Sequence, residues 1–373
     1  MDIDSIKEYF IQLHDDRQSA KVDYPLFDIL FGSLCAIMAG GRGWTDIREY
    51  VMGHHEWFLK HKLFENGVPV DDTFARLISS IKPAAFQECF LNWMRSVHKL
   101  TQGEVVAIDG KTLRGSYNRS DRGSTIHMIS AYASANQLVL GQLKTDAKSN
   151  EITAIPALIK MLELRGALVT IDAMACQTQI AQAILEQGAD YLLAVKGNQG
   201  KLSDAIKAAF APQRQAALEA HEPLKLQRGR VELRTSHVLD TNELIGDFSG
   251  WPGLKSIIMV EYFRAEKGKS ISLEQRYYIC SKELTSSEAG DAVRAHWGIE
   301  SMHWILDVSL REDACQIYRD NAAENLAGLR HMVLNMLRAE ETKISMPMKQ
   351  KRCMMNPAFL ERVLLAGFAS MAN

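Results

Sequence analysis

The sequence predicts an α/β protein in which a mixed β-sheet is flanked by helices. The first 100 residues have apolar positions at helical spacing, and three β-type segments then follow one another between residues 105 and 143. Helices and strands alternate from there to residue 195. Three strands in succession favour an antiparallel meander, whereas strand–helix–strand order favours parallel pairing. Together these patterns predict one sheet that contains both kinds of pairing.

Residues 1–100 are predicted to form a helical N-terminal domain. Apolar residues recur at the helix period from Leu26 to Met38, from Ile47 to Phe58 and from Phe86 to Val97. Asp72-Thr73 stands where an N-cap would begin a further helix.

The composition predicts a globular protein of the cytoplasm. The chain has 373 residues, of which 47% are hydrophobic and 24% charged, enough for one large domain or two to three smaller ones. Its six cysteines are widely spaced, which disfavours disulfides and structural zinc and favours a reducing compartment. The most apolar run, Ile29 to Gly41, is about 13 residues, short of the roughly 20 that span a membrane. We therefore expect no membrane partner.

Residues 101–199 are predicted to form the first part of the catalytic core. Two apolar β-type runs in it are each followed directly by an aspartate, Asp109 in one case and Asp172 in the other. Further strands are expected at 125–133, 137–143 and 191–195, and helices at 152–164 and 180–187.

From residue 200 to residue 285 the pattern changes to a β-rich insertion. Its alternating segments are expected at 224–239, 254–264 and 271–280, after a helix near 201–219. A long helix is then predicted over 286–310, with further helices over 321–340 and 357–371, so that residues 286–373 complete the core.

The two aspartates are the first candidates for a reactive site. Since each follows a strand, both are expected at the carboxyl ends of strands, where open α/β sheets gather ligand-binding groups. Carboxylates that are held close together stay ionised most readily when divalent cations lie between them. Oxygen-only ligation without a His/Cys cluster favours Mg²⁺ or Mn²⁺ over zinc. Two such ions about 4 Å apart catalyse in-line displacement at phosphodiesters.

A third carboxylate is expected from the long helix, which carries two histidines and two acids on one stripe. The stripe consists of His296, Glu300, His303 and Asp307. Trp297 provides apolar bulk on a neighbouring face with which the helix could dock. Asp307, Glu312 or Asp313 could assist or supply the third acid, and spacing alone leaves this open.

Several long sequence blocks in fixed order resemble the DDE transposases of bacterial insertion sequences, in the branch of H-repeat-associated proteins. The blocks are Ala107 to Ser116, Lys148 to Pro156, Thr170 to Met174, Gly188 to Tyr191, Lys196 to Gln199, His296 to Glu300 and His303 to Val308. Because they are spread over nearly the whole chain, they are far more specific than a scattered triad of acids.

This resemblance implies an RNase H-like core with the β-rich insertion before the last catalytic helix. It assigns Asp109, Asp172 and Glu300 as the catalytic carboxylates, which would hold two Mg²⁺ or Mn²⁺ ions. The expected activity is metal-dependent cleavage of double-stranded DNA at the ends of an insertion element, followed by strand transfer into target DNA. We expect a homodimer on DNA, a nucleoid-associated location in the cytoplasm and no small-molecule substrate. The N-terminal helical domain would then be a candidate for DNA binding.

The last helix departs from the family's pattern. Related transposases commonly have a Tyr-x2-Arg-x3-Glu-x6-Lys signature, whose positions are occupied here by Val293, His296, Glu300 and Asp307. Only the glutamate is retained, so phosphate contacts must come from other groups, for which Arg294 and His296 are candidates. Two smaller differences are Ala175, where related proteins have glycine, and Asp71, where they have histidine.

Other basic residues and one asparagine are expected to contact DNA, although such residues are more often ordinary surface residues. Lys111, Arg114, Lys196 and Asn198 follow strand ends, and Arg228, Arg230 and Arg234 lie on one face of a strand in the insertion. A second basic stretch lies at Lys349 to Arg352. The net charge of −2 does not exclude such local basic surfaces.

Two alternatives share the same sequence features. An RNase H-like nuclease or resolvase would cut DNA without joining it, and a catalytically silent transposase remnant would bind DNA only. The intact acids argue against the remnant. A glycosidase-type pair of carboxylates is disfavoured, because basic residues beside Asp109 and a three-acid layout suit a polyanion better.

Overall fold

The computed structural model describes residues 3–18, 22–118, 120–145, 151–211, 226–227, 230–266 and 272–369. Its strands form one nine-stranded sheet in the order β3-β2-β1-β4-β5-β9-β8-β7-β6. They are β1 (Val105–Leu113), β2 (Ile126–Ala133), β3 (Leu138–Lys144), β4 (Leu168–Ile171), β5 (Asp190–Val195), β6 (Leu226–Gln227), β7 (Arg230–Asp240), β8 (Ser256–Glu266) and β9 (Ser272–Cys280).

The predicted mixed sheet is confirmed. β1, β2 and β3 pair antiparallel, whereas β4 is parallel to β1 and β5 is parallel to β4. The order β3-β2-β1-β4-β5 agrees with the RNase H-like core that the family resemblance implies. β4 is entirely buried, as expected for a short apolar strand between two parallel neighbours.

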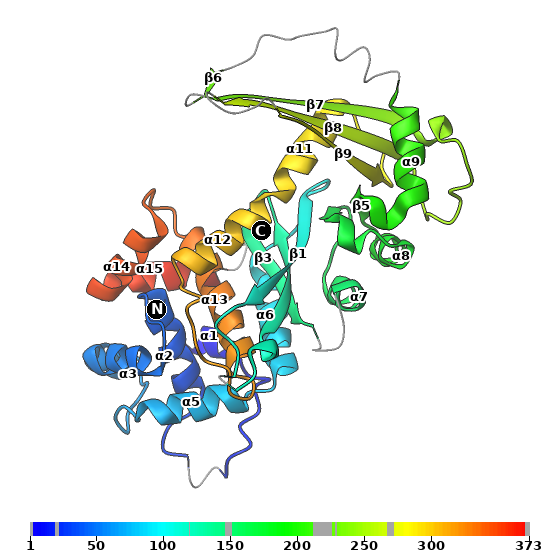
Figure 1. Cartoon of the computed structure of the whole chain (residues 1–373). Helices are drawn as coiled ribbons and strands as arrows, with labels where there is room; N and C mark the ends of the chain where they lie inside the picture. Colours follow the sequence, from blue (N-terminus) through cyan, green and yellow to red (C-terminus); the bar gives the residue numbers. More distant parts are fainter. Residues whose placement is uncertain are drawn as a thin grey trace.

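The β-rich insertion extends this sheet. β9 pairs antiparallel with β5, and β8 and β7 follow outward as long antiparallel strands. In Figure 1 these strands form an extension of the sheet that projects beyond the N-terminal helices and α13. Arg228 lies outside the described residues, and for Arg230 only the backbone of β7 is described.

Helices cover both faces of the central strands. Figure 1 shows α7 (Glu151–Met161) and α8 (Thr178–Glu186) on one side and α6 (Pro83–Val97), α12 (Gly298–Val308) and α13 (Ala322–Ala339) on the other. The insertion is flanked by α9 (Gly200–Ala209) and α11 (Ser286–His296), and short 3-10 turns follow β4 and β5 as η3 (Ala173–Ala175) and η4 (Gly197–Gln199).

The N-terminal residues are helical and pack around α13. They form α1 (Ile3–Glu8), α2 (Leu26–Met38), α3 (Trp44–Gly53), α4 (His55–Lys60) and α5 (Asp71–Ser80) in addition to α6. α13 contacts α2, α5 and α6 as well as β3. One hydrophobic cluster therefore runs from the N-terminal helices through α13 to the sheet. None of the helices in the described ranges is long and apolar enough to cross a membrane.

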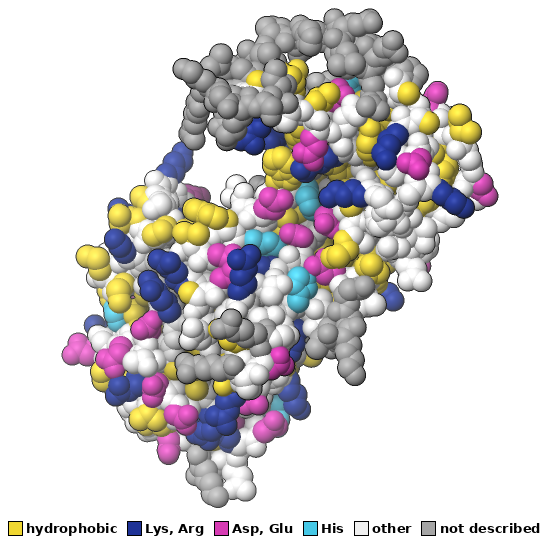
Figure 2. All heavy atoms as spheres, in the orientation of Figure 1, with side chains coloured by type: hydrophobic (Ala, Val, Ile, Leu, Met, Phe, Trp, Pro, Cys, Tyr) yellow, Lys and Arg dark blue, Asp and Glu magenta, His cyan; other side chains and the backbone are white. Residues whose placement is uncertain are grey.

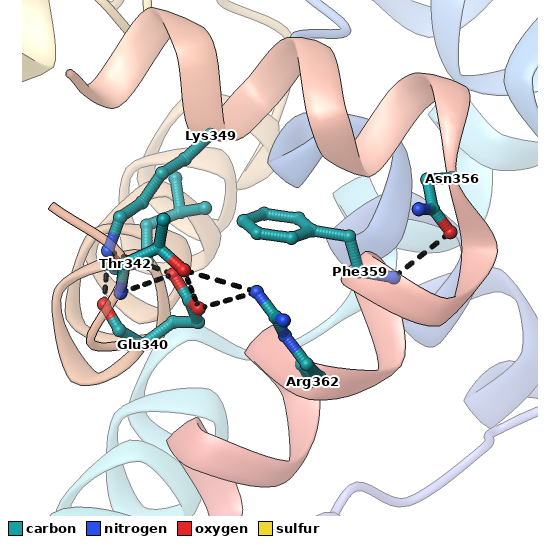
Figure 3. A network of polar contacts seen from close by, with 7 residues as sticks. Glu340, Thr342, Lys349, Asn356, Phe359 and Arg362 are labelled. Atoms are coloured by element: carbon teal, nitrogen blue, oxygen red, sulfur yellow. Dashed lines mark hydrogen bonds and ion pairs between the residues drawn. The ribbon is translucent and has the colours of Figure 1, made fainter. Parts of the chain in front are cut away.

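A polar network joins the end of α13 to α14 (Met346–Met355) and α15 (Pro357–Phe368) (Figure 3). The Glu340 carboxylate accepts hydrogen bonds from Thr342 and from Arg362, the latter at 2.9 Å, and pairs with the ammonium of Lys349 at 3.2 Å. Lys349 is only 5% exposed and also donates to the carbonyl of Leu337. The basic stretch at the C-terminus is thus partly structural, because its first lysine is not available to DNA.

Two boundary predictions are wrong. The strand expected to end at Asp109 continues to Leu113, because its second half remains paired with β2 after the parallel pairing with β4 has ended. The single helix predicted over 286–310 is two helices, α11 and α12, which meet at Trp297. Gly298 follows the junction and packs closely on Tyr132, since a Cβ there would lie 3.0 Å from the ring.

Candidate active site

Asp109 and Asp172 are brought side by side by the register of two parallel strands. β1 and β4 pair from Val105↔Leu168 to Ile108↔Ile171, so the next residue of each chain is one of the two aspartates. The Asp172 side chain caps η3 and accepts a hydrogen bond of 3.0 Å from the backbone N–H of Met174. The ladder ends here because β4 turns away into η3, which leaves both carboxylates at its edge.

The Asp109 carboxyl group is in an unusual electrostatic environment. Burial raises its pKa to about 7, and the charges of Glu151, Asp172 and Glu300 act in the same direction, against one backbone hydrogen bond from Gly110. His303 on α12 places its Nδ1 3.6 Å from the Asp109 Oδ2. Burial lowers the pKa of His303 to about 3, with Lys111 adding to the effect, so the imidazole does not neutralise this site. The acids around Asp109, which are Glu151, Asp172 and Glu300, therefore form a cluster with excess negative charge.

Glu300 and Asp172 both line a cleft of about 400 Å³. The cleft is lined by residues of β4, β5, β9, α9, α11 and α12, among them Asp172, Lys196, Lys207, Arg276, His296, Trp297 and Glu300. Glu300, the expected third acid, thus lies near Asp172 although its helix is remote from β4 in sequence. Figure 2 shows acidic, basic and histidine side chains close together in the middle of this face.

His296 anchors the end of α11 to β4. Its Nδ1 lies 2.9 Å from the hydroxyl of Thr170, two residues before Asp172. Burial lowers the pKa of His296, although the charge of Asp172 opposes this. The ring is therefore neutral near pH 7 and does not supply the positive charge that arginine has at the same position of the family signature.

Lys111 does not face the cleft as a free phosphate-binding group. Its ammonium, on a side chain 10% exposed, bonds to the carboxylates of Asp307 and, at 2.5 Å, Glu312. Although burial opposes ionisation, Lys111 helps to hold the pKa of Glu312 below its ordinary value. We call these three residues the β1–α12 brace, because they join the strand of Asp109 to the helix of Glu300. Asp313 instead pairs with the exposed Arg114 at 3.6 Å.

The other residues expected to contact DNA lie in two regions, one beside the turns that follow β4 and β5 and the other on β7 and α11. Lys196 is exposed and lines the cleft, whereas the amide of Asn198 donates to the carbonyl of Ala173 at 2.7 Å and so supports the turn after Asp172. Arg234 lies over the Trp297 ring at 4.4 Å. Arg294 is exposed on α11.

Sequence reasoning missed several residues that the fold adds to this site. Arg276 on β9 lies 5.1 Å from the Tyr262 ring, which stacks on Trp297 with 5.8 Å between centroids. Glu151 and His127 lie against Gly110, the residue that follows Asp109. No motif marks these residues, because their side chains meet only when the sheet has formed. Glu151 was, however, part of a block that carried the family resemblance.

The donor set suits a hard divalent cation, since carboxylate oxygens dominate it and its negative charge is not neutralised. Within the described ranges, no three His, Cys, Asp or Glu side chains are close enough together to hold one ion. Water and phosphate oxygens would complete the coordination of each ion, which is the usual situation for Mg²⁺ in phosphoryl-transfer enzymes.

Asp109→Asn is expected to stabilise the metal-free protein by an amount that grows with pH. Asparagine resembles the protonated acid, so it avoids the cost of a buried charge. Because the pKa of Asp109 is raised from 3.8 to about 7, this cost is absent below about pH 4, grows up to about pH 7 and is constant above it. Melting temperatures of both proteins in a chelator at about pH 4, 6 and 8 measure it. A pH-independent difference would contradict this environment for Asp109.

The fold and these carboxylates define an α/β protein whose mixed sheet has an acidic centre where the parallel pairing of β1 with β4 ends. Residues 7–94 match the family described as "DDE_Tnp_1-associated", and residues 100–336 match "Transposase DDE domain". The chain belongs to the DDE transposase family, in its H-repeat-associated branch.

Relatives of similar length carry the same family names. "Putative transposase YncI" of Escherichia coli O157:H7 is 44% identical over 373 residues, which cover 98% of this chain and 95% of that protein. "H repeat-associated putative transposase YhhI" of Escherichia coli strain K12 is 43% identical, with 98% of each chain covered. A piggyBac transposase, solved in a synaptic complex with hairpin DNA, superposes with a TM-score of 0.44 and 13% identity over 96% of this chain and 77% of that chain.

Proposed function

We propose that this chain is an active transposase that cuts DNA at the ends of an insertion element and joins the freed strand to target DNA. The observation that carries the proposal is the placement of Asp109 and Asp172 at the end of one parallel ladder, with Glu300 lining the same cleft as Asp172. Three carboxylates on separate elements, with excess negative charge, suit metal-dependent chemistry at a phosphodiester.

In this proposal Asp109, Asp172 and Glu300 would hold two Mg²⁺ or Mn²⁺ ions, and Asp109 would be a ligand of both. When bound, such ions activate the attacking oxygen and stabilise the leaving oxygen of an in-line displacement. Water attack at the element end leaves a 3′-hydroxyl, and that hydroxyl then attacks a phosphodiester of the target and displaces its 3′-oxygen. No covalent bond to the protein is formed in either step.

The role of the chain's other residues is to position the acids and the DNA. Thr170 and His296 fix the end of α11 against β4, and Asn198 supports the turn that follows Asp172. Lys196, Lys207 and Arg276 give the cleft positive charge for a phosphate backbone. Transposition requires two element ends to be held together, so we expect at least two copies of the chain on DNA, acting at the nucleoid.

A combined cleavage and strand-transfer assay tests the function. Labelled duplexes from the gene's own flanking ends are incubated with the full chain, a supercoiled target and Mg²⁺ or Mn²⁺. Metal-dependent nicking with joined products supports a transposase. Cutting without joining would instead indicate a nuclease or resolvase, and DNA binding with no cutting in either metal would indicate a silent remnant.

Lys196→Ala is expected to weaken DNA binding uniformly across sequences, because an exposed lysine in the cleft contacts phosphate rather than bases. The slope of the logarithm of the binding constant against that of salt concentration should decrease by about 0.9. Fluorescence anisotropy at several salt concentrations measures both effects. Lys160→Ala, an exposed lysine at the end of α7, is the matched control. An unchanged slope in Lys196→Ala would place the DNA backbone elsewhere.

A further inference from the structure

Glu151 is the acid that the fold brings closest to the backbone beside Asp109. It is the first residue of α7, and its carboxylate lies against Gly110. A Cβ added at Gly110 would be 2.0 Å from Glu151 Oε1 and 2.5 Å from His127 Nε2. Only a residue without a side chain allows this approach, so the glycine after Asp109 makes room for a fourth carboxylate.

His127 on β2 holds the Glu151 carboxylate in place. The imidazole Nε2 lies 2.6 Å from Glu151 Oε1, and its Nδ1 lies 2.9 Å from the hydroxyl of Thr112 on β1. If Nε2 carries the proton, the Thr112 hydroxyl donates to Nδ1 and the imidazole donates to the carboxylate, so one tautomer satisfies both bonds. Among the side chains that the structure describes, His127 is the hydrogen-bond partner of the Glu151 carboxylate.

An ordinary structural role does not account for this arrangement. A glutamate in the first turn of a helix is stabilised by the helix dipole wherever it points. Here its carboxylate lies against the backbone of the residue that follows Asp109, so it adds negative charge beside that acid. Carboxylates that face each other repel unless a cation lies between them. Ligating carboxylates are commonly fixed by a supporting hydrogen bond of the kind His127 provides.

We propose that Glu151 is a fourth carboxylate of the catalytic centre, which contacts a divalent cation held by Asp109, and that His127 is its positioning residue. This inference rests on the proposed function, because it concerns the same site. It adds an acid from α7 to the three that the family resemblance assigns.

The test is Mn²⁺ binding to the full-length protein, measured by electron paramagnetic resonance titration with and without duplex DNA. Glu151→Gln is expected to weaken Mn²⁺ binding by about tenfold or more, and His127→Gln by a smaller factor. Glu151→Asp keeps the carboxylate and should recover part of the affinity. Glu186→Gln, an exposed residue at the end of α8, is the matched control and should bind as the wild type does.

Melting temperatures in a chelator separate a metal-binding role from a structural one. A metal-binding role predicts that Mn²⁺ raises the melting temperature of the wild type more than that of Glu151→Gln. The inference is overturned if Glu151→Gln binds Mn²⁺ within about twofold of the wild type while Asp109→Asn has lost binding. If the wild type neither binds Mn²⁺ nor cuts DNA, the proposed function fails and the inference fails with it.

Discussion

Asp172→Asn is expected to reduce DNA cleavage and strand transfer by about a thousandfold, with folding preserved. Loss of a metal-binding carboxylate removes several kcal/mol of transition-state stabilisation, and each 1.4 kcal/mol corresponds to about a factor of ten in rate. Because Asp172 is exposed and caps only a short turn, the substitution should have little effect on stability. Asp109→Asn and Glu300→Gln should reduce both reactions to a similar extent, measured as initial rates on labelled duplexes.

Asp291→Asn is the matched control for these variants. Asp291 is exposed on α11 and is close in sequence to Val293 and His296, which line the cleft. It does not itself line the cleft. It should retain activity within a few-fold. If a variant lost cleavage but kept strand transfer, or the reverse, the two steps would use different acids. That result would contradict a shared centre.

Lys111→Met is expected to destabilise the protein by about 3 kcal/mol or more, because it leaves Asp307 and Glu312 in the brace without their counter-charge. Glu312 is 3% exposed, so its charge cannot be recovered by water. Urea denaturation of the wild type and the variant at neutral pH measures the difference. The deficit should decrease in acid, where protonation of the carboxylates removes the unpaired charges.

Lys160→Met provides the comparison for this second variant, because substitution of an exposed lysine usually changes stability by less than about 0.5 kcal/mol. A deficit for Lys111→Met as small as this would contradict the brace as a buried structural element. The double variant Lys111→Met/Asp307→Leu should recover part of the stability, since it removes one of the two orphaned charges together with its partner.

The β1–α12 brace also explains why the last helix departs from the family signature at its lysine position, which the sequence alone could not explain. The signature lysine position on α12 is occupied by Asp307, which suggested a missing positive charge. In the structure Asp307 binds Lys111, which is 196 positions earlier in the chain, so a lysine from β1 provides the ammonium at this point. Local sequence spacing cannot reveal that a lysine on β1 replaces one on α12, because the two residues meet only through the contact of α12 with β1.

The central sheet was predictable because β1 to β3 are apolar runs that follow one another, whereas β4 and β5 alternate with helices of regular period. Placing Asp109 and Asp172 after two such runs was sufficient to predict that they converge, even though β1 continues past Asp109 to Leu113. That continuation was not predictable from local pattern, because Gly110 to Leu113 are held by pairing with β2 rather than by their own apolar character.

The surroundings of the acids were harder to predict. Trp297 and Tyr262 stack across α11 and β8, and Arg234 and Arg276 lie over them. The sequence indicated a basic strand face but not its aromatic partners. The pair of His127 with Glu151 likewise depends on how α7 packs on β2. These contacts follow from tertiary packing, which has no local sequence signal.

The most direct test of the central claim is a structure of the full chain with Mn²⁺ and a duplex from the element end, with anomalous scattering used to locate the metal. The proposal predicts two Mn²⁺ ions beside the scissile phosphate, both in contact with Asp109, one with Asp172 and the other with Glu300. Manganese bound away from Asp109, or DNA seated outside the cleft that Asp172 and Glu300 line, would contradict it.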